Sequence, residues 1–337
     1  MTRRRSTLGV TVLLALVIAL PVAAQPSLTW TAGSVGGGWY AISGGMAELL
    51  REKAQLNIKV IPGGGVQNPV LVQKGEAELG MGLPPVLQLA MNGDPDIYKG
   101  QKMPDLRALA GNMSLNTFHF YVAADSPYAN MSLEEIFRGK KPIRLAISKP
   151  GSSDILVFDW VMEFYGLCAP GKPAECYKTW EAAGAKFFRG SYAEQAGAFK
   201  DRNVDGTFTF LALPGASITE ASVGRKLKLI PFPEPLLAHL AKFGVGKGTI
   251  PANTYPQAAN AAEPVVSATM GTTITVHANM KPDLAYTITK ALNDNPDRVR
   301  KIHGSLADYD PAKGHMFLGV PLHPGAERYY KEKGWLK

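Results

Sequence analysis

Three short apolar runs in this chain each break into a Gly- or Ser-rich loop that leads directly into an amphipathic helix. We call them the first junction (residues 29–50), the second junction (residues 58–75) and the third junction (residues 143–166). At such a junction the first backbone N–H groups of the helix lack carbonyl partners, and the helix dipole makes this end positive. Three junctions of this kind predict an α/β protein that captures a small anionic or zwitterionic solute.

The order of strand and helix signals indicates the same fold class. Runs of β-forming residues predict strands at 28–32, 57–61, 78–82, 106–111, 117–123, 143–148, 185–188, 206–213, 227–232 and 265–276. Apolar residues at helical spacing predict helices that include 42–50, 66–74, 132–138, 154–165, 192–200, 234–243, 282–294 and the C-terminal segment. The alternation favours largely parallel sheets. We expect 117–123 to cross between two lobes and 227–232 to lead back to the first lobe.

Residues 1–24 have the pattern of a secretory signal peptide. Three arginines at positions 3–5 precede an apolar stretch over 10–20, and small residues at 22–24 form a cleavage site. The apolar stretch is too short to span a bilayer as a helix. We expect cleavage before Gln25 and a periplasmic protein, and an uncleaved membrane anchor is the alternative.

The charge and the cysteines exclude several classes of protein. Removal of residues 1–24 lowers the formal net charge from +8 to +5, and no dense Lys/Arg cluster with aromatic residues is present, which argues against nucleic acid as a partner. Cys168 and Cys176 flank a turn-rich segment, and in an oxidising compartment they predict a disulfide. A redox pair or metal site fits this spacing less well. Because the six histidines lack metal-binding spacing, we expect no metal and no cofactor.

The first junction supplies five candidate ligand-binding residues. Gly36, Gly37 and Gly38 allow close backbone approach and unusual φ angles, so their N–H groups can contact a solute. The alternative is a tight turn with nothing bound. Trp39 and Tyr40 open the helix, and each either lies over the solute or packs into the core.

The second junction supplies four more candidates. Gly64, Gly65 and Val66 form the loop, and their N–H groups offer a second anion site. Asn68 either binds the solute directly or caps the helix that follows.

The third junction and the strand after it add polar candidates. Ser152 and Ser153 offer hydroxyl and N–H groups, although Ser153 can equally serve as a helix N-cap. Arg189 ends a predicted strand, where a guanidinium can hold a carboxylate through two hydrogen bonds. The alternative for Arg189 is an exposed surface position.

Four stretches together resemble the TAXI family, the solute receptors of one branch of the TRAP transporters. They are the Gly-Gly-aromatic opening at 36–40 with Gly44 and Gly45, the loop at 63–68 with 75–79, the loop at 149–154, and the C-terminal segments 321–326 and 329–334. The C-terminal segments are the most specific match. Glu78 stands where the family usually has Asp, and Ser153 and Asp154 replace a small Gly and Thr.

The resemblance implies a type II periplasmic-binding-protein fold, with two α/β lobes joined by two or more crossing strands. It places lobe 1 at 25–118 and 232–337 and lobe 2 at 119–231. It also implies a monomer that carries a small carboxylate or an amino acid, such as glutamate or 2-oxoglutarate, to a TRAP-type membrane permease.

The resemblance also extends the candidate site in lobe 2. The segment 210–216 resembles the family segment that lines the far side of the cleft, which brings in Phe210 and Pro214. Core packing is the alternative for Phe210. Asp154 is the largest departure from the family pattern. It either holds a ligand ammonium or is only a first-turn residue that the helix dipole favours.

Other functions fit the residues less well. The pattern Gly36-x-Gly38-x-x-Ala41 meets the loose dinucleotide-binding fingerprint, but no acidic residue ends the second predicted strand. A hydrolase would need a nucleophile beside a base, and no G-x-S-x-G sequence occurs. We therefore expect a protein that is not an enzyme. A receptor of a tripartite-tricarboxylate or ABC importer, with the same broad fold, is a nearer alternative.

Overall fold

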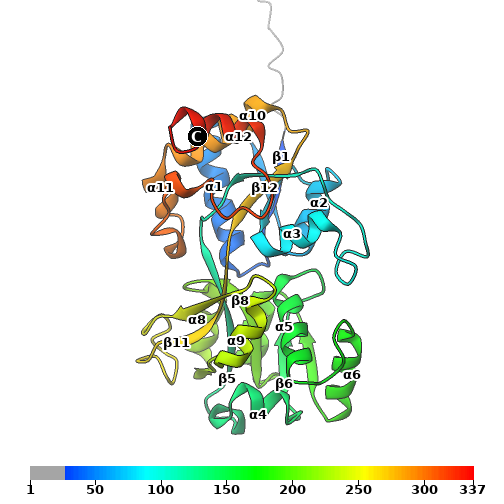
Figure 1. The fold of residues 1–337 in the computed structure, drawn as a ribbon. Coiled ribbons are helices and arrows are strands. Elements are labelled where there is room, and N and C mark those ends of the chain that lie inside the picture. The colour runs from blue at the N-terminus through cyan, green and yellow to red at the C-terminus, as the bar shows by residue number, and fades with distance from the viewer. Residues whose placement is uncertain (1–26) are drawn as a thin grey trace, which may run out of the picture.

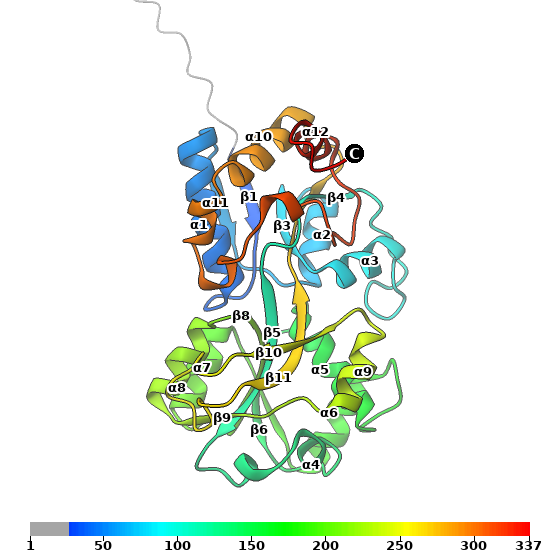
Figure 2. The ribbon, with the colours of Figure 1, turned by 60° about the vertical axis from the view of Figure 1, so that its left-hand side comes forward.

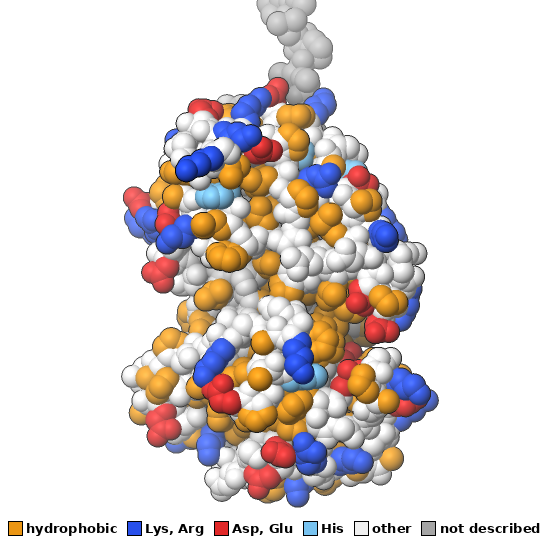
Figure 3. Space-filling view, viewed as in Figure 1, with side chains coloured by type: hydrophobic (Ala, Val, Ile, Leu, Met, Phe, Trp, Pro, Cys, Tyr) orange, Lys and Arg blue, Asp and Glu red, His pale blue; other side chains and the backbone are white. Residues whose placement is uncertain are grey.

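The structure is a computed structural model, and it describes residues 27–337. Two α/β lobes lie one above the other, with a narrow waist between them (Figures 1 and 3). The expected signal peptide at 1–24 lies outside the described residues. Within residues 27–337, the model contains no helix with the length and apolar character that a membrane crossing requires.

Lobe 1 contains a five-stranded sheet in the order β2-β1-β3-β12-β4. β1 pairs in parallel with β2 and β3, whereas β12 pairs antiparallel with β3 and β4. The elements are β1 (Leu28–Thr31), α1 (Gly38–Ala54), β2 (Ile58–Ile61), α2 (Gln67–Gln73), β3 (Leu79–Gly82), α3 (Pro84–Asn92), β4 (Leu106–Ala110), β12 (Thr273–His277), α10 (Pro282–Asn293), α11 (Pro296–Arg300) and α12 (Pro324–Glu332). The C-terminal helix α12 packs on α10 and β4 (Figure 2).

Lobe 2 contains a seven-stranded sheet in the order β10-β11-β5-β8-β6-β7, with β9 paired to β5. β6 runs parallel to β7 and β8, and the pairs that involve β5 are antiparallel. The elements are β5 (Leu115–Ala123), α4 (Leu133–Phe137), β6 (Arg144–Ile147), α5 (Ser153–Phe164), α6 (Pro173–Ala182), β7 (Lys186–Arg189), α7 (Tyr192–Lys200), β8 (Gly206–Ala212), α8 (Ala216–Gly224), β9 (Leu227–Leu229), α9 (Glu234–Ala241), β10 (Gly246–Ile250) and β11 (Val265–Gly271).

The described chain passes between the sheets twice. It leaves lobe 1 between β4 and β5 and returns between β11 and β12. The predicted return at 227–232 is therefore wrong, because β9 pairs with β5 inside lobe 2 and α9, β10 and β11 follow it there. The predicted lobe boundaries at 118 and 232 move to about 114 and 272. The run 265–276 misled the prediction because it reads as one strand, whereas Thr272 separates two strands that lie in different lobes.

Several local predictions are confirmed. The two lobes, their mixed sheets and the paired crossings give the expected type II periplasmic-binding-protein fold. Ser132 and Glu135 form a capping box at the start of α4. Cys168, in the loop after α5, forms a disulfide with Cys176 in α6.

Candidate functional site

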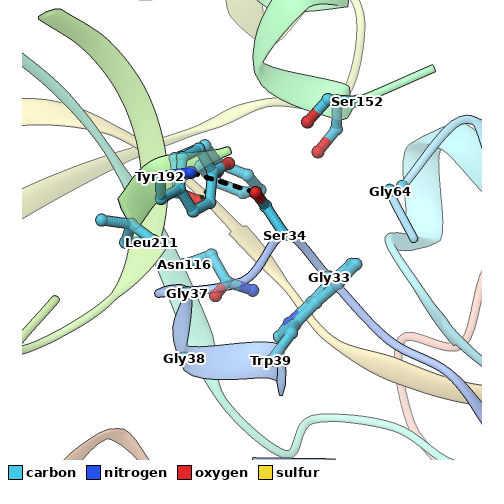
Figure 4. Close-up of a pocket in the computed structure, with 13 residues that line it drawn as sticks. Gly33, Ser34, Gly37, Gly38, Trp39, Gly64, Asn116, Ser152, Tyr192 and Leu211 are labelled. Atoms are coloured by element: carbon cyan, nitrogen blue, oxygen red, sulfur yellow. Dashed lines mark hydrogen bonds between the residues drawn. The ribbon is translucent and has the colours of Figure 1, made fainter. Parts of the chain in front are cut away.

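A small cavity lies between the lobes at the waist (Figure 4). Its volume is about 20 Å³, which is room for one water molecule. Its walls are Gly33, Ser34, Gly37, Gly38, Trp39, Gly64 and Gly65 from lobe 1, and Asn116, Ser152, Ser153, Tyr192, Phe210 and Leu211 from lobe 2. The three predicted junctions therefore meet at one place, although no contiguous part of the sequence shows this.

The first junction places the N-terminus of α1 against this cavity. Gly37 is the N-cap in an extended conformation and donates its N–H to the Ser34 carbonyl at 3.0 Å. Among the described residues, no acceptor lies within hydrogen-bond distance of the N–H groups of Gly38, Trp39 and Tyr40. The first turn of α1 also carries no acidic side chain. This end of the helix therefore keeps its donors and its positive dipole free for an anion.

In the second junction, the two donors at the start of α2 are occupied. The N–H groups of Val66 and Gln67 both donate to the carbonyl of Gly151, at 3.2 and 3.0 Å, and Gly151 belongs to lobe 2. Gly64 lies so close to this carbonyl that an added Cβ would be 2.6 Å from the oxygen. In this arrangement the start of α2 contacts the opposite lobe instead of offering an anion site.

Asn68 is buried in lobe 1 and does not line the cavity. Its Oδ1 accepts from Thr31 Oγ1 at 2.8 Å and from the N–H of Gly64 at 2.9 Å. Its Nδ2 donates to the carbonyls of Ala32 and Met81, at 2.6 and 2.7 Å. Neither predicted role fits, because the side chain shapes the loop that precedes α2 and makes no capping bond to that helix.

The third junction brings hydroxyl groups to the cavity. Ser152 is the N-cap of α5, and its hydroxyl donates to Asp154 Oδ1, whereas Ser153 is the first helical residue. Both serines line the cavity. Asp154 lies behind them, fully buried, and burial raises its pKa to about 6. Its Oδ2 has no hydrogen-bond partner among the described residues.

Five other predicted residues lie away from the cavity. Arg189 lies over the Tyr177 ring, 4.6 Å from its centroid, and donates to the Ser148 carbonyl at 3.4 Å. Gly36 has φ +84° and packs against the backbone of α7, so its role is the contact between lobes.

The other three residues lie on separate parts of the molecule. Pro214 follows β8 and packs beside Gly304, and Tyr40 is half-buried on α1. Val66 lines a separate open hollow of about 370 Å³ between the loop at 94–99 and α5. None of these five lines the small cavity.

Sequence reasoning missed five residues of the cavity wall, and Tyr192 and Asn116 are the most informative. The N–H of Tyr192 donates to Ser34 Oγ at 3.1 Å, which joins α7 to the first junction (Figure 4). The capping box Ser191–Glu194 marks the start of α7 and could have shown a fourth strand-to-helix junction. Asn116 lies in β5, and its Oδ1 is an accessible acceptor with no partner among the described residues. No local sequence signal distinguishes Asn116, Gly33, Ser34 or Leu211.

The lobes are in direct contact around the cavity. Besides the bonds to Gly151, the N–H of Ala193 donates to the Val35 carbonyl at 3.2 Å, and Tyr192 contacts Ser34. These bonds connect both sides of the waist, so the structure represents a closed arrangement. A solute larger than water requires the lobes to separate first.

Comparison with known proteins identifies the family. The model of the NMT1-like family matches residues 30–334, so this chain belongs to that family.

Solved structures with low sequence identity match most of this chain. The substrate-binding protein of an amino acid ABC transporter is 8% identical, with a TM-score of 0.45, over 82% of this chain and 97% of that one. The arginine-, lysine- and histidine-binding protein ArtJ from Geobacillus stearothermophilus is 12% identical, with a TM-score of 0.46, over 86% and 97%. The alkanesulfonate-binding protein SsuA from Xanthomonas axonopodis pv. citri is 15% identical, with a TM-score of 0.43, over 92% and 85%.

Proposed function

We propose that this chain is an extracytoplasmic receptor of a transporter and that it captures a small carboxylate or amino acid between its lobes. The observation that carries the proposal is the N-terminus of α1, whose first N–H groups have no partner among residues 27–337 and whose residues Gly38 and Trp39 line the interlobe cavity. Main-chain donors and a helix dipole bind a carboxylate without any catalytic side chain.

The other polar groups favour a solute with both a carboxylate and a donor group. Asn116 Oδ1 is an accessible acceptor on the cavity wall. Ser152 and Ser153 supply hydroxyl groups, and the carboxyl of Asp154 lies directly behind them. A glutamate-like solute, with two carboxylates and an ammonium, matches this set of donors and acceptors. 2-Oxoglutarate matches the donors but has no group for the acceptors.

Binding would proceed by separation and closure of the lobes. The two crossings allow lobe 2 to rotate as a body, because hinge motions need only a few residues that change their backbone angles. Closure then moves Gly151 towards the second junction and Tyr192 towards Ser34, and a bound solute holds the lobes further apart than in this structure, whose cavity has room for one water molecule. Hydrogen bonds to a carboxylate strengthen when the cavity excludes water.

The partner we propose is a TRAP-type permease that receives the closed, loaded receptor. The resemblance of the C-terminal segments to the TAXI receptors supports this partner, and the signal-like N-terminus and the disulfide support an extracytoplasmic location.

Native mass spectrometry of freshly purified protein tests the proposal first, because it shows a co-purifying solute directly. Isothermal titration with L-glutamate, 2-oxoglutarate and L-arginine then measures affinity. We expect L-glutamate to bind most tightly, because 2-oxoglutarate lacks a donor for Asn116 Oδ1 and L-arginine lacks the second carboxylate. A protein that binds no small acid, or that turns over an ester substrate without any ligand-induced rise in melting temperature, would contradict the receptor function.

A further inference from the structure

Thr272 lies at the point where the chain returns from lobe 2 to lobe 1, between β11 and β12. It is fully buried. Its Oγ1 lies 3.1 Å from Trp39 Nε1, 2.9 Å from Asn116 Nδ2 and 3.0 Å from Ser114 Oγ. We call these four residues the hinge cluster.

The hinge cluster connects both crossings to the cavity. Ser114 lies in the outgoing crossing between β4 and β5, and Thr272 lies in the returning one. Trp39 from α1 and Asn116 from β5 both line the cavity, from opposite lobes. One hydroxyl group therefore bridges the two crossings and two parts of the cavity wall.

The hydrogen bonds at this hydroxyl are fully determined. A threonine hydroxyl accepts two hydrogen bonds and donates one. Trp39 Nε1 and Asn116 Nδ2 are both donors, so they occupy the two acceptor positions of Thr272 Oγ1. Its own hydrogen must then be donated to Ser114 Oγ. All three hydrogen-bonding positions of the Thr272 hydroxyl are occupied, so movement of any partner breaks a hydrogen bond at a buried polar group.

We propose that Thr272 is a positioning residue that couples the solute cavity to the hinge. Rotation of lobe 2 about the crossings moves Asn116 and Ser114 relative to Trp39, so opening must break at least one bond of the hinge cluster. A solute that holds Trp39 or Asn116 in place therefore stabilises the closed arrangement of the two crossings. This inference rests on the proposed receptor function, since it assigns the closing step of that function to a residue.

Thr275, three residues further along the chain in β12, provides a matched control. It is also fully buried, and its hydroxyl donates to the Gly80 carbonyl at 3.0 Å, inside lobe 1. Neither residue of this bond lies in a crossing or lines the cavity. Substitution of Thr275 by Val therefore removes a buried hydroxyl without disturbing the hinge cluster.

The experiment compares Thr272→Val, Thr272→Ser and Thr275→Val in the solute-free protein. NMR measures hydrogen exchange of the Trp39 indole proton, assigned among the five tryptophans by Trp39→Phe. Pulsed electron resonance measures the distance between spin labels at Lys53→Cys on α1 and Lys178→Cys on α6, both exposed positions. We expect the Trp39 indole proton to exchange about tenfold faster in Thr272→Val than in the wild type, because a buried hydrogen bond is lost. We also expect a broader distribution of distances between the two spin labels in this variant. Thr272→Ser and Thr275→Val should match the wild type.

Equal behaviour of Thr272→Val and Thr275→Val in both measurements would overturn the inference. The inference would also be overturned if Thr272→Ser changed the exchange rate and the distance distribution as much as Thr272→Val does. In that case the methyl group, and not the hydroxyl, would be responsible. If Thr272→Val does not fold, Ser114→Ala removes the acceptor of the Thr272 hydrogen, and it should give a smaller change in the same direction. Neither measurement uses a solute, so a wild type that binds no acid would refute the receptor function separately.

Discussion

The first and second junctions carry the same three glycines, at 36–38 and 63–65, yet their helices end in different environments. The N–H groups at the start of α1 have no acceptor among the described residues. Those of Val66 and Gln67 at the start of α2 are occupied by the Gly151 carbonyl of the opposite lobe. Two loops with the same run of three glycines therefore differ, since one leaves free donors at the start of its helix and the other makes a closing contact.

The difference depends on what lies across the waist. A main-chain carbonyl faces α2, whereas hydroxyl, amide and aromatic side chains face α1. The comparison teaches that a Gly-rich strand-to-helix loop is a candidate anion site only where the facing lobe leaves its donors free. Three substitutions separate the two roles and a fourth tests the third junction, and they are given from the largest expected effect to the smallest.

Asn68→Ala tests whether the second junction is structural. The substitution removes one hydrogen bond from each of four buried groups, namely the Thr31 hydroxyl, the Gly64 N–H and two carbonyls. At about 1 kcal/mol for each bond, the free energy of unfolding should fall by about 4 kcal/mol. Chemical denaturation measures this loss. A variant that keeps its stability but loses solute affinity would show instead that Asn68 contacts the solute.

The third junction differs from the other two because it carries a buried carboxyl, and Asp154→Asn tests its protonation. Burial raises the pKa of Asp154 to about 6, above its ordinary 3.8, so the folded protein holds this proton more tightly than the unfolded chain. The free energy of unfolding should therefore fall as the pH rises from about 4 to about 6, by up to about 3 kcal/mol. Urea denaturation at pH 4, 5, 6 and 7 should show this fall in the wild type, and a smaller one in the variant. Parallel curves would mean that Asp154 titrates normally.

Gly37→Val tests the first junction as the solute site. An added Cβ would lie 2.9 Å from Tyr192 Cδ2 and 3.0 Å from the Ser34 carbonyl oxygen, and the valine methyls would extend further into the cavity wall. We expect about a 100-fold loss of affinity for the co-purified solute, because overpacking typically costs 1–3 kcal/mol. Titration calorimetry measures affinity, and circular dichroism checks the fold. Gly44→Ala on the outer part of α1, where nothing lies within 4 Å, is the control.

Gly64→Ala tests the second junction as a closing contact. Its φ is not in the left-handed region, so alanine is tolerated in the open lobe, but its Cβ would lie 2.6 Å from the Gly151 carbonyl oxygen. Closure should become less favourable and affinity should fall about tenfold. X-ray scattering should show a larger radius of gyration with the solute present than for the wild type. Unchanged scattering together with the full loss of binding would assign a solute contact to this loop.

Local chemistry allowed much of the fold to be predicted. The helix at 192–200 and the capping box at Ser132 follow from apolar spacing and from side chains that bond their own backbone. The return crossing at Thr272 could not be predicted, because β-branched residues are frequent in both β11 and β12 and the run 265–276 resembles one strand. Their separation into two lobes depends on pairing with β5 and β3, which are distant in sequence.

The candidate site was only partly predictable for the same reason. Gly37, Gly38, Trp39, Gly64, Gly65, Ser152, Ser153 and Phe210 were predicted and line the cavity. Asn116 and Tyr192 line it as well, but they face the cavity only because two lobes close upon each other. Arg189 carries the right chemistry for a carboxylate, yet the ring of Tyr177 holds it elsewhere. Local sequence thus indicates donors, and only the tertiary contacts decide which donors remain free.

A crystal structure of the protein with its co-purified solute tests this account most directly. The account predicts a solute carboxylate oxygen about 2.7–3.1 Å from the backbone nitrogen of Gly38, Trp39 or Tyr40. It also predicts that the start of α2 faces Gly151 of lobe 2 and does not contact the solute. A solute bound at the start of α2, with the start of α1 facing only water or protein, would contradict it.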